Sequence, residues 1–232
     1  MTTPRLWLVI PAAGSGQRMH SSRPKQYQSL RGNLILDLAI SRITATVTLA
    51  GCVVAIRPDD PWWGETRASK DDRITCCTGG RERADSVLAG LQSLQARAEE
   101  NDWVLVHDAA RPCLHPDDLN RLVSRLSDHG VGGLLATPVA DTLKKTGAGT
   151  LDVQETVDRS HLWRALTPQM FRYGILKTAL QAALSAGRPV TDEASAVEQS
   201  GYFPCIVEGR PDNIKITVPA DLALADFLLS RF

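Results

Sequence analysis

A glycine-rich turn followed by two cations is the first segment of this sequence that could bind a ligand. It runs Pro11-Ala-Ala-Gly-Ser-Gly16, and Arg18 and Lys25 follow it. Its glycines allow tight turns and let backbone N–H groups approach an anion closely. Residues 1–36 carry five cations and no acid, in a chain whose 26 basic and 26 acidic side chains balance. We expect a triphosphate to bind here; the alternative is a glycine turn with solvated surface cations.

This turn departs from two familiar nucleotide-binding motifs. The dinucleotide fingerprint G-x-G-x-x-G needs glycine or alanine where Met19 stands, which disfavours a nicotinamide-dependent dehydrogenase but leaves it as an alternative. The P-loop needs Gly-Lys followed by Ser or Thr, and the turn lacks that triplet. The chemistry therefore depends on Arg18 and Lys25 rather than on either motif.

An aspartate follows a buried-looking strand in the segment Val106-His-Asp108-Ala-Ala-Arg111-Pro. Ligands of an open parallel sheet bind beyond the carboxyl ends of its strands, so Asp108 should lie on the ligand-binding edge. A carboxylate there could hold Mg²⁺, or another divalent cation, through one or two direct bonds. The alternative is a helix-capping aspartate paired with Arg111. We assign His107 no role.

Other segments place hydroxyls, glycines or cations near the ends of predicted elements. Gly79-Gly80-Arg-Glu-Arg-Ala-Asp-Ser86 is a glycine turn entering a helix, and it could read a nucleobase or a ribose; ordinary capping is the alternative. The remaining segments are Thr156–Arg159, Leu166–Gln169, Thr191–Ser195 and Asp212–Lys215. Each alone is typical of a solvated surface, whereas together they suit a phosphorylated, hydroxyl-rich substrate.

Apolar strands alternating with amphipathic helices would position these residues. The predicted strands are Leu6–Ile10, Cys52–Ile56 and Trp103–His107, with weaker ones at Gly133–Thr137 and Cys205–Val207. The predicted helices are Glu82–Glu99, one that opens at Pro116 and one that opens at Pro219. This alternation predicts an α/β fold: a Rossmann-like, mainly parallel sheet with helices on both faces.

One segment does not follow this alternation of strands and helices. Asp141–Thr146, a glycine turn at 147–149 and Leu151–Asp158 predict a protruding β-hairpin arm, at about residues 138–161 of a single domain spanning 1–232. Two lone strands are marginally stable in water, so the arm should need a packing partner. That partner is either another part of the same subunit or a second subunit.

Composition excludes several classes of protein. The balanced charge argues against binding nucleic acid or a membrane surface. The longest uncharged run, Ile43–Ile56, is shorter than the ~18 residues that a membrane helix needs, and no secretory signal is visible. Five scattered cysteines without a C-x-x-C pair argue against a structural metal and indicate buried thiols in a reducing cytoplasm. We expect a soluble, cytoplasmic protein.

Taken in order, the motifs resemble those of the 2-C-methyl-D-erythritol 4-phosphate cytidylyltransferases of non-mevalonate isoprenoid biosynthesis. The resemblance runs through Pro-Ala-Ala-Gly-x-Gly-x-Arg-Met19, Pro-Lys-Gln-Tyr27, Gly-Gly-x-x-Arg-x-x-Ser-Val87, Val-His-Asp-Ala-Ala-Arg-Pro112, Thr-Val-Asp-Arg159, Thr-Pro-Gln169, Thr-Asp-Glu-Ala-Ser195 and Asp-Asn-Ile-Lys215. The first motif is shared with many sugar-nucleotide pyrophosphorylases, whereas the whole ordered set is far more specific. Arg81 departs from the family pattern, which has an acidic residue beside the ribose.

The resemblance implies a reaction and a role for each matching residue. The phosphate of methylerythritol phosphate would attack the α-phosphorus of CTP, and pyrophosphate would leave. Arg18 and Lys25 would stabilise the transition state, and Arg159 and Lys215 would align the attacking phosphate. The nucleotide would contact Ala12, Ala13, Gly14, Gly16, Gly80, Ser86 and Asp108, with Asp108 also meeting Mg²⁺. The acceptor would lie near Arg111, Thr142, Thr167, Thr191 and Asp212.

The resemblance also implies a homodimer, in which the arm reaches across so that Thr142 and Arg159 serve the neighbour's site. Because a substrate phosphate is already ionised, no protein nucleophile is needed, and catalysis should be alignment plus electrostatic stabilisation. Two alternatives remain open: a cytidylyltransferase for another polyol phosphate such as ribitol 5-phosphate, and a regulatory module that binds CTP without turnover.

Overall fold

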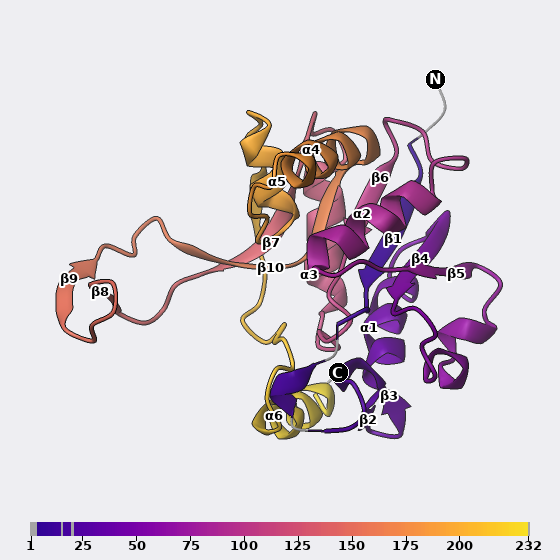
Figure 1. Cartoon of the computed structure of the whole chain (residues 1–232), viewed down its shortest axis with the longest axis horizontal. Helices are drawn as coiled ribbons and strands as arrows, with labels where there is room; N and C mark the ends of the chain where they lie inside the picture. The colour runs from indigo at the N-terminus through magenta and orange to yellow at the C-terminus, as the bar shows by residue number, and fades with distance from the viewer. Residues whose placement is uncertain (1–3, 15, 20, 232) are drawn as a thin grey trace.

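The computed structural model describes residues 4–14, 16–19 and 21–231. A seven-stranded sheet runs through the body of the molecule in the order β11-β7-β10-β6-β1-β4-β5 (Figure 1). Its strands are β1 (Leu6–Pro11), β4 (Gly51–Ile56), β5 (Ile74–Thr78), β6 (Trp103–Val106), β7 (Gly132–Pro138), β10 (Trp163–Arg172) and β11 (Cys205–Glu208). All five predicted strands are present, within two residues of their expected ends.

The sheet is mainly parallel, as the sequence predicts, with one antiparallel strand in its middle. The pairs β1–β4, β1–β6, β4–β5 and β11–β7 are parallel, whereas β10 runs antiparallel to both β6 and β7. The prediction that Leu166–Gln169 lies at a loop or an element end is wrong, because the segment lies inside β10.

Helices cover both faces of the sheet, because side chains of successive strand residues point to opposite faces. Leu8 and Ile10 of β1 pack with α1 (Ile35–Thr44) and α3 (Pro116–Leu126). Trp7 and Val9 pack on the other face with α2 (Arg83–Ser93), α4 (Tyr173–Ser185) and α5 (Glu193–Gln199). The last helix, α6 (Ala220–Leu229), forms a third cluster with Ile35 and Ile216.

The predicted helix starts are confirmed, but one predicted end is wrong. α3 begins with Pro116 at its first turn, and α6 begins directly after Pro219. α2 ends at Ser93 rather than at Glu99. Residues 95–99 carry no large apolar side chain, so a further turn would gain little burial to offset the entropy of ordering it.

The segment after β1 is built from short elements. It contains the 3₁₀ turns η1 (Gln17–Met19) and η2 (Lys25–Tyr27), then the small strands β2 (Ser29–Leu30) and β3 (Asn33–Leu34). Two further 3₁₀ turns, η3 (Trp63–Glu65) and η4 (Ala68–Lys70), follow β4. These turns bring chain segments close to the carboxyl end of β1.

The hairpin arm projects away from the body (Figure 1). β8 (Leu143–Thr146) and β9 (Val153–Val157) pair antiparallel and form a two-stranded sheet of their own. Every residue of β8 is exposed, as is every residue of β9 except Val157. The arm therefore has little support from its own subunit.

The five cysteines are free thiols, and they are not all buried as the sequence analysis expected. Cys52 and Cys113 are buried, Cys77 and Cys205 are partly exposed, and Cys76 is exposed. Cys76 lies on β5, the edge strand of the sheet, which has a neighbouring strand on one side only. Among the described residues, no helix is both long and apolar enough to cross a bilayer.

Candidate active site

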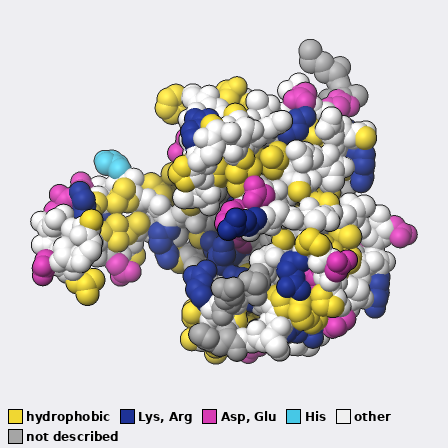
Figure 2. Space-filling model, viewed as in Figure 1, with side chains coloured by type: hydrophobic (Ala, Val, Ile, Leu, Met, Phe, Trp, Pro, Cys, Tyr) yellow, Lys and Arg dark blue, Asp and Glu magenta, His cyan; other side chains and the backbone are white. Residues whose placement is uncertain are grey.

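A pocket lies at the carboxyl ends of β1 and β6, where the sequence analysis expected a ligand. The predicted site residues that line it are Ala12, Ala13, Gly14, Lys25, Gly80, Ser86, Asp108 and Lys215. They come from four distant parts of the chain. Figure 2 shows Lys and Arg side chains gathered around a hollow near the base of the arm.

The glycine turn leaves β1 in a fixed direction. The backbone N–H of Ala12 donates to the Ala55 carbonyl of β4 (2.7 Å), which continues the sheet by one residue. Gly16 has a left-handed φ of 66°, and a Cβ added there would lie 3.1 Å from the Lys25 backbone nitrogen. Glycine at this position therefore lets the turn pack directly against the segment that carries Lys25.

Three cations gather beside this turn. Lys25 Nζ donates to the Ile216 carbonyl (3.0 Å), and Lys215 Nζ lies 3.0 Å from the Asp108 carboxylate. Burial, together with the neighbouring charges of Lys215 and Arg18, lowers the pKa of Lys25 to about 8. Arg18 is exposed on η1 and does not line the pocket, although its charge acts on Lys25.

Asp108 is the centre of the charge network. Its Oδ1 accepts from Arg83 Nε (2.9 Å), while its Oδ2 lies 3.3 Å from Arg111 Nε and 3.0 Å from Lys215 Nζ. Burial alone would raise the pKa of this carboxyl, but the charges of Arg83, Lys215 and Arg111 hold it well below its usual value. The pairing with Arg111 that we weighed as the alternative is present, within a larger network.

Two residues of that network were missed by the sequence analysis. Arg83, at the start of α2, also bonds Glu193, at the start of α5, through NH1 (2.6 Å) and NH2 (3.1 Å). Glu193 is fully buried, so its charge needs this partner. Arg83 lies inside the motif Gly-Gly-Arg-Glu-Arg, but nothing local signals a partner 110 positions away.

The second glycine turn packs against the first. A Cβ on Gly79 would lie 2.7 Å from the Ala13 side chain, so glycine is needed for this close approach. The Gly80 N–H donates to Ser86 Oγ (3.1 Å), and Glu82 and Asp85 form a capping box at the start of α2. The capping alternative is therefore present, and the same turn also lines the pocket.

A layer of buried polar groups supports Asp108 from β10. Thr167 Oγ1 accepts from the Asp108 backbone N–H (3.1 Å) and lies 3.0 Å from His107 Nδ1. His107 is buried, which lowers its pKa to about 4 and keeps it neutral near pH 7. Arg111 NH1 donates to the Asn213 carbonyl (2.6 Å). In this structure Thr167 and Arg111 support the pocket from behind, and their contact with a substrate stays a prediction.

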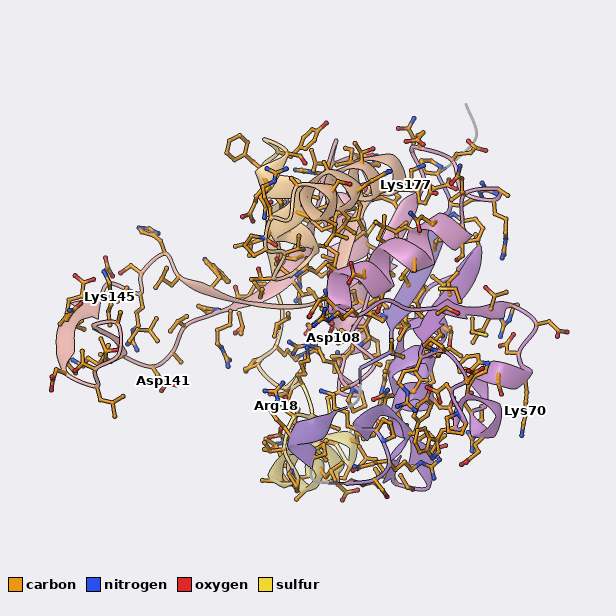
Figure 3. All side chains as sticks on the ribbon, viewed as in Figure 1. Arg18, Lys70, Asp108, Asp141, Lys145 and Lys177 are labelled. Atoms are coloured by element: carbon orange, nitrogen blue, oxygen red, sulfur yellow. The ribbon has the colours of Figure 1, made fainter. Side chains whose placement is uncertain are left out.

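Four predicted acceptor residues do not line the pocket of their own chain. Thr191 is exposed just before α5, and Asp212 is exposed just before Lys215. Thr142 and Arg159 lie on the arm, where Arg159 donates to the Ala140 carbonyl. In Figure 3 the arm, marked by Asp141 and Lys145, extends away from Asp108. Roles for these four residues stay predictions.

The carboxylates of the pocket limit how a metal could bind. Among the residues that the structure describes, no group of three His, Cys, Asp or Glu side chains could hold an ion. Asp108 and Glu82 line the pocket, and Asp108 is already paired with cations of the network. Glu193 is engaged by Arg83. A divalent cation would therefore need ligands from a substrate in addition to Asp108.

Comparisons with known proteins agree with this arrangement. The IspD family, described as 2-C-methyl-D-erythritol 4-phosphate cytidylyltransferase, matches residues 6–231. Proteins of that name are 54% identical in Ectopseudomonas mendocina, over 94% of this chain and 93% of the relative, and 49% identical in Vibrio vulnificus, over 96% and 94%.

The same similarity extends to a solved structure. The crystal structure of the Francisella tularensis 2-C-methyl-D-erythritol 4-phosphate cytidylyltransferase (IspD) superimposes with a TM-score of 0.82 at 36% identity, over 97% of this chain and 99% of that one. Because sequence and fold match over nearly the whole chain, this chain belongs to the 2-C-methyl-D-erythritol 4-phosphate cytidylyltransferase family.

Proposed function

We propose that this chain transfers CMP from CTP to 2-C-methyl-D-erythritol 4-phosphate, giving 4-diphosphocytidyl-2-C-methyl-D-erythritol and pyrophosphate. The observation that carries the proposal is that Lys25 and Lys215 line one pocket, with Arg18 near enough for its charge to act on Lys25, together with membership of the family. These cations come from positions almost 200 residues apart and meet beside the glycine turn. Such a site suits a polyanion better than any neutral ligand.

The reaction needs alignment and charge neutralisation. An oxygen of the acceptor phosphate forms a new bond to the α-phosphorus of CTP, and the bond from that phosphorus to the bridging oxygen of the β-phosphate breaks. Both reactants are anions, so their encounter is repulsive until cations screen it. Arg18 and Lys25 would stabilise charge on the triphosphate, and Lys215 would hold the incoming phosphate.

The nucleoside end would lie between the two glycine turns. Ala13 and Gly80 line the pocket through small groups, which leaves the backbone free to approach a base. Ser86 is buried and fixes the Gly80 N–H, so it would shape the cytosine site from behind. Gly14 and Gly16 would allow the turn to follow the phosphates.

Asp108 is the residue that would hold Mg²⁺, together with phosphate oxygens of CTP. The donor set fits, because Mg²⁺ in nucleotide sites commonly uses one or two carboxylates plus substrate phosphates and water. When bound, the ion would neutralise phosphate charge. The network keeps Asp108 ionised at any pH near neutrality, which is the form able to bind a cation.

We further propose that two copies share each site through the arm. Thr142 and Arg159 are exposed and lie outside the pocket of their own chain. The arm also carries exposed apolar side chains at Leu143, Leu151 and Val153, with Leu151 94% exposed. A second copy that covers the arm would bury these groups and place both polar residues in the neighbour's pocket.

One assay tests the chemistry directly. We would mix the protein with Mg²⁺ and CTP, add methylerythritol phosphate or ribitol 5-phosphate, and identify products by mass. A CMP adduct of methylerythritol phosphate supports the proposal. An adduct of ribitol phosphate alone would assign the chain a different acceptor, and CTP binding without any adduct would make it a regulatory module.

Complementation tests the shared site. A Lys25→Ala chain and an Arg159→Ala chain would each be nearly inactive. In their heterodimer, the pocket of the Arg159→Ala chain has an intact body and receives an intact arm. Co-expression should then restore about a quarter of wild-type activity, because half the dimers are mixed and each has one good site. No recovery in the mixture would mean that each chain uses its own Arg159.

A further inference from the structure

The residue after Lys25 joins the glycine turn to the cation-bearing segment. Gln26 lies in η2 and is only 3% exposed. Its Nε2 donates to two carbonyls of the turn, those of Ala12 (2.7 Å) and Gly14 (3.0 Å). One carboxamide therefore fixes two peptide groups of a turn that lies more than ten positions earlier in the chain.

These bonds orient the amides that the turn offers to a ligand. In a trans peptide the N–H points opposite to the C=O. When Gln26 holds the Ala12 carbonyl, it also turns the N–H of Ala13 away from the Gln26 carboxamide. Ala13 lines the pocket. The direction of a predicted nucleotide donor thus depends on a side chain that lies one position from a predicted catalytic cation.

The far end of the same 3₁₀ turn is anchored to another part of the body. Tyr27 is fully buried, its hydroxyl donates to Asp60 Oδ2 (3.1 Å), and its ring stacks on Trp62 with centroids 6.0 Å apart. The Tyr27 N–H donates to the Pro24 carbonyl (2.9 Å). This anchor packs Trp62 against the segment that carries Lys25.

Lys25 is therefore held between two anchors. On one side Gln26 ties the backbone to the glycine turn, and on the other Tyr27 ties it to the segment after β4. Gly16 also packs against the Lys25 backbone nitrogen. Lys25 has a flexible four-carbon stem, so it can act from a fixed point only if its backbone is fixed.

We propose that Gln26 is a positioning residue of the transfer reaction: it aligns the glycine turn with Lys25 so that backbone donors and the ammonium group act on the same triphosphate. This inference rests on the proposed function. It assigns Gln26 no contact with the reacting atoms. Displacement of groups aligned in this way by about 1 Å can cost up to about 10²-fold in rate.

The test replaces the carboxamide without changing its size. Gln26→Met removes both donors and keeps an unbranched side chain of similar volume. We expect kcat/KM for CTP to fall about 10- to 100-fold, with KM for methylerythritol phosphate within about twofold of wild type. Gln28→Met is the matched control, because Gln28 follows the same turn and only reaches the Arg23 carbonyl at 3.5 Å. Wild-type kinetics in Gln26→Met would overturn the inference.

A double substitution tests whether Gln26 acts by positioning Lys25 or whether Gln26→Met merely disturbs the fold. In a Lys25→Ala background, Gln26→Met should lose most of its effect on kcat/KM for CTP, because the group it aligns is gone. A full multiplicative loss there would mean that Gln26 acts independently of Lys25 and would overturn the inference. If Gln26→Met does not fold, Gln26→Asn is used, since its shorter carboxamide cannot reach both carbonyls.

Failure of this inference can be told apart from failure of the proposed function. If wild-type protein makes the product and Gln26→Met matches it, only the role of Gln26 falls. If wild-type protein makes no product, the proposed function falls, and calorimetric CTP binding by the two proteins still tests Gln26. Weaker CTP binding by Gln26→Met than by Gln28→Met would then support the alignment of the turn, and equal binding would overturn it.

Discussion

In the pocket, Asp108 is 6% exposed and meets three cations, whereas in the arm Lys145 and Glu155 form a pair in which both side chains are more than half exposed. The strands of the two regions also differ in how much of their surface is exposed. β6 beside Asp108 is buried along its whole length, while β8 and β9 expose almost every residue.

The pocket and the arm therefore differ in how far the chain's own residues pair or bury their side chains. In the body, Asp108 is paired with Arg83, Arg111 and Lys215 of the same chain. The arm exposes apolar groups and carries two predicted site residues away from the pocket. A region of this kind is typical of a surface that another molecule covers.

The largest effect should come from removing the central charge of the pocket. Asp108→Asn leaves Arg111 and Lys215 without a carboxylate, and it leaves Arg83 with Glu193 alone. Breaking a buried ion pair in this way costs about 3–5 kcal/mol of unfolding free energy. Urea denaturation at pH 7 measures it. Because its folded pKa is depressed, Asp108 stabilises the fold above the unfolded value of about 3.9 and loses this effect only as pH falls below it.

The arm provides the control for that measurement. Glu155→Gln breaks an exposed pair, and such pairs contribute at most about 1 kcal/mol. If Asp108→Asn unfolds no more easily than Glu155→Gln, the pocket charges are effectively solvated and the contrast between the two regions is wrong.

Those two regions were also unequally predictable from sequence. The strands of the body and the starts of α3 and α6 follow from apolar runs and prolines, which act locally. Asp108 was placed correctly because it directly follows such a run. β10 was missed because Thr167 and Gln169 make it look like a surface loop, yet both are buried and hydrogen-bonded to distant residues.

Contacts between residues far apart in the sequence could not be predicted from local sequence patterns. Arg83 and Glu193 each look like ordinary residues at a helix start, and only the packing of α2 and α5 against the same end of the sheet joins them. For the arm, the sequence predicts a hairpin that lacks support, and within residues 4–14, 16–19 and 21–231 its strands stay almost wholly exposed.

A second prediction compares two lysines of the same type in the two regions. Lys25→Ala should lower kcat by about 10²–10³, the usual loss for one preorganised charge-stabilising group. Lys145→Ala should leave kcat close to wild type, since its ammonium group pairs with Glu155 on the arm. Pyrophosphate release measures both. An unchanged kcat in Lys25→Ala would remove that residue from the mechanism.

The third prediction concerns the pH dependence of the same lysine. With a pKa of about 8 in the free protein, Lys25 loses its charge above that pH, so kcat/KM for CTP should fall about tenfold per pH unit. Lys25→Arg keeps its charge at high pH and should abolish this alkaline limb. Stability should respond in the opposite sense: unfolding restores the ordinary pKa of 10.5, so deprotonation of Lys25 favours the fold between about pH 8 and 10.5. An alkaline limb that persists in Lys25→Arg would belong to another group.

The smallest effect should come from an apolar residue of the arm. Val153 is 59% exposed, so Val153→Ala should change the unfolding free energy of dilute protein by less than about 0.5 kcal/mol. Val104→Ala in β6 removes fully buried methyl groups and should cost about 1.5 kcal/mol or more. If a second copy covers the arm, the cost of Val153→Ala must grow with protein concentration, because binding stabilises only the associated form. Denaturation at two protein concentrations a hundredfold apart decides this. If the change in unfolding free energy caused by Val153→Ala is the same at both, Val153 stays exposed to water and no second copy covers it.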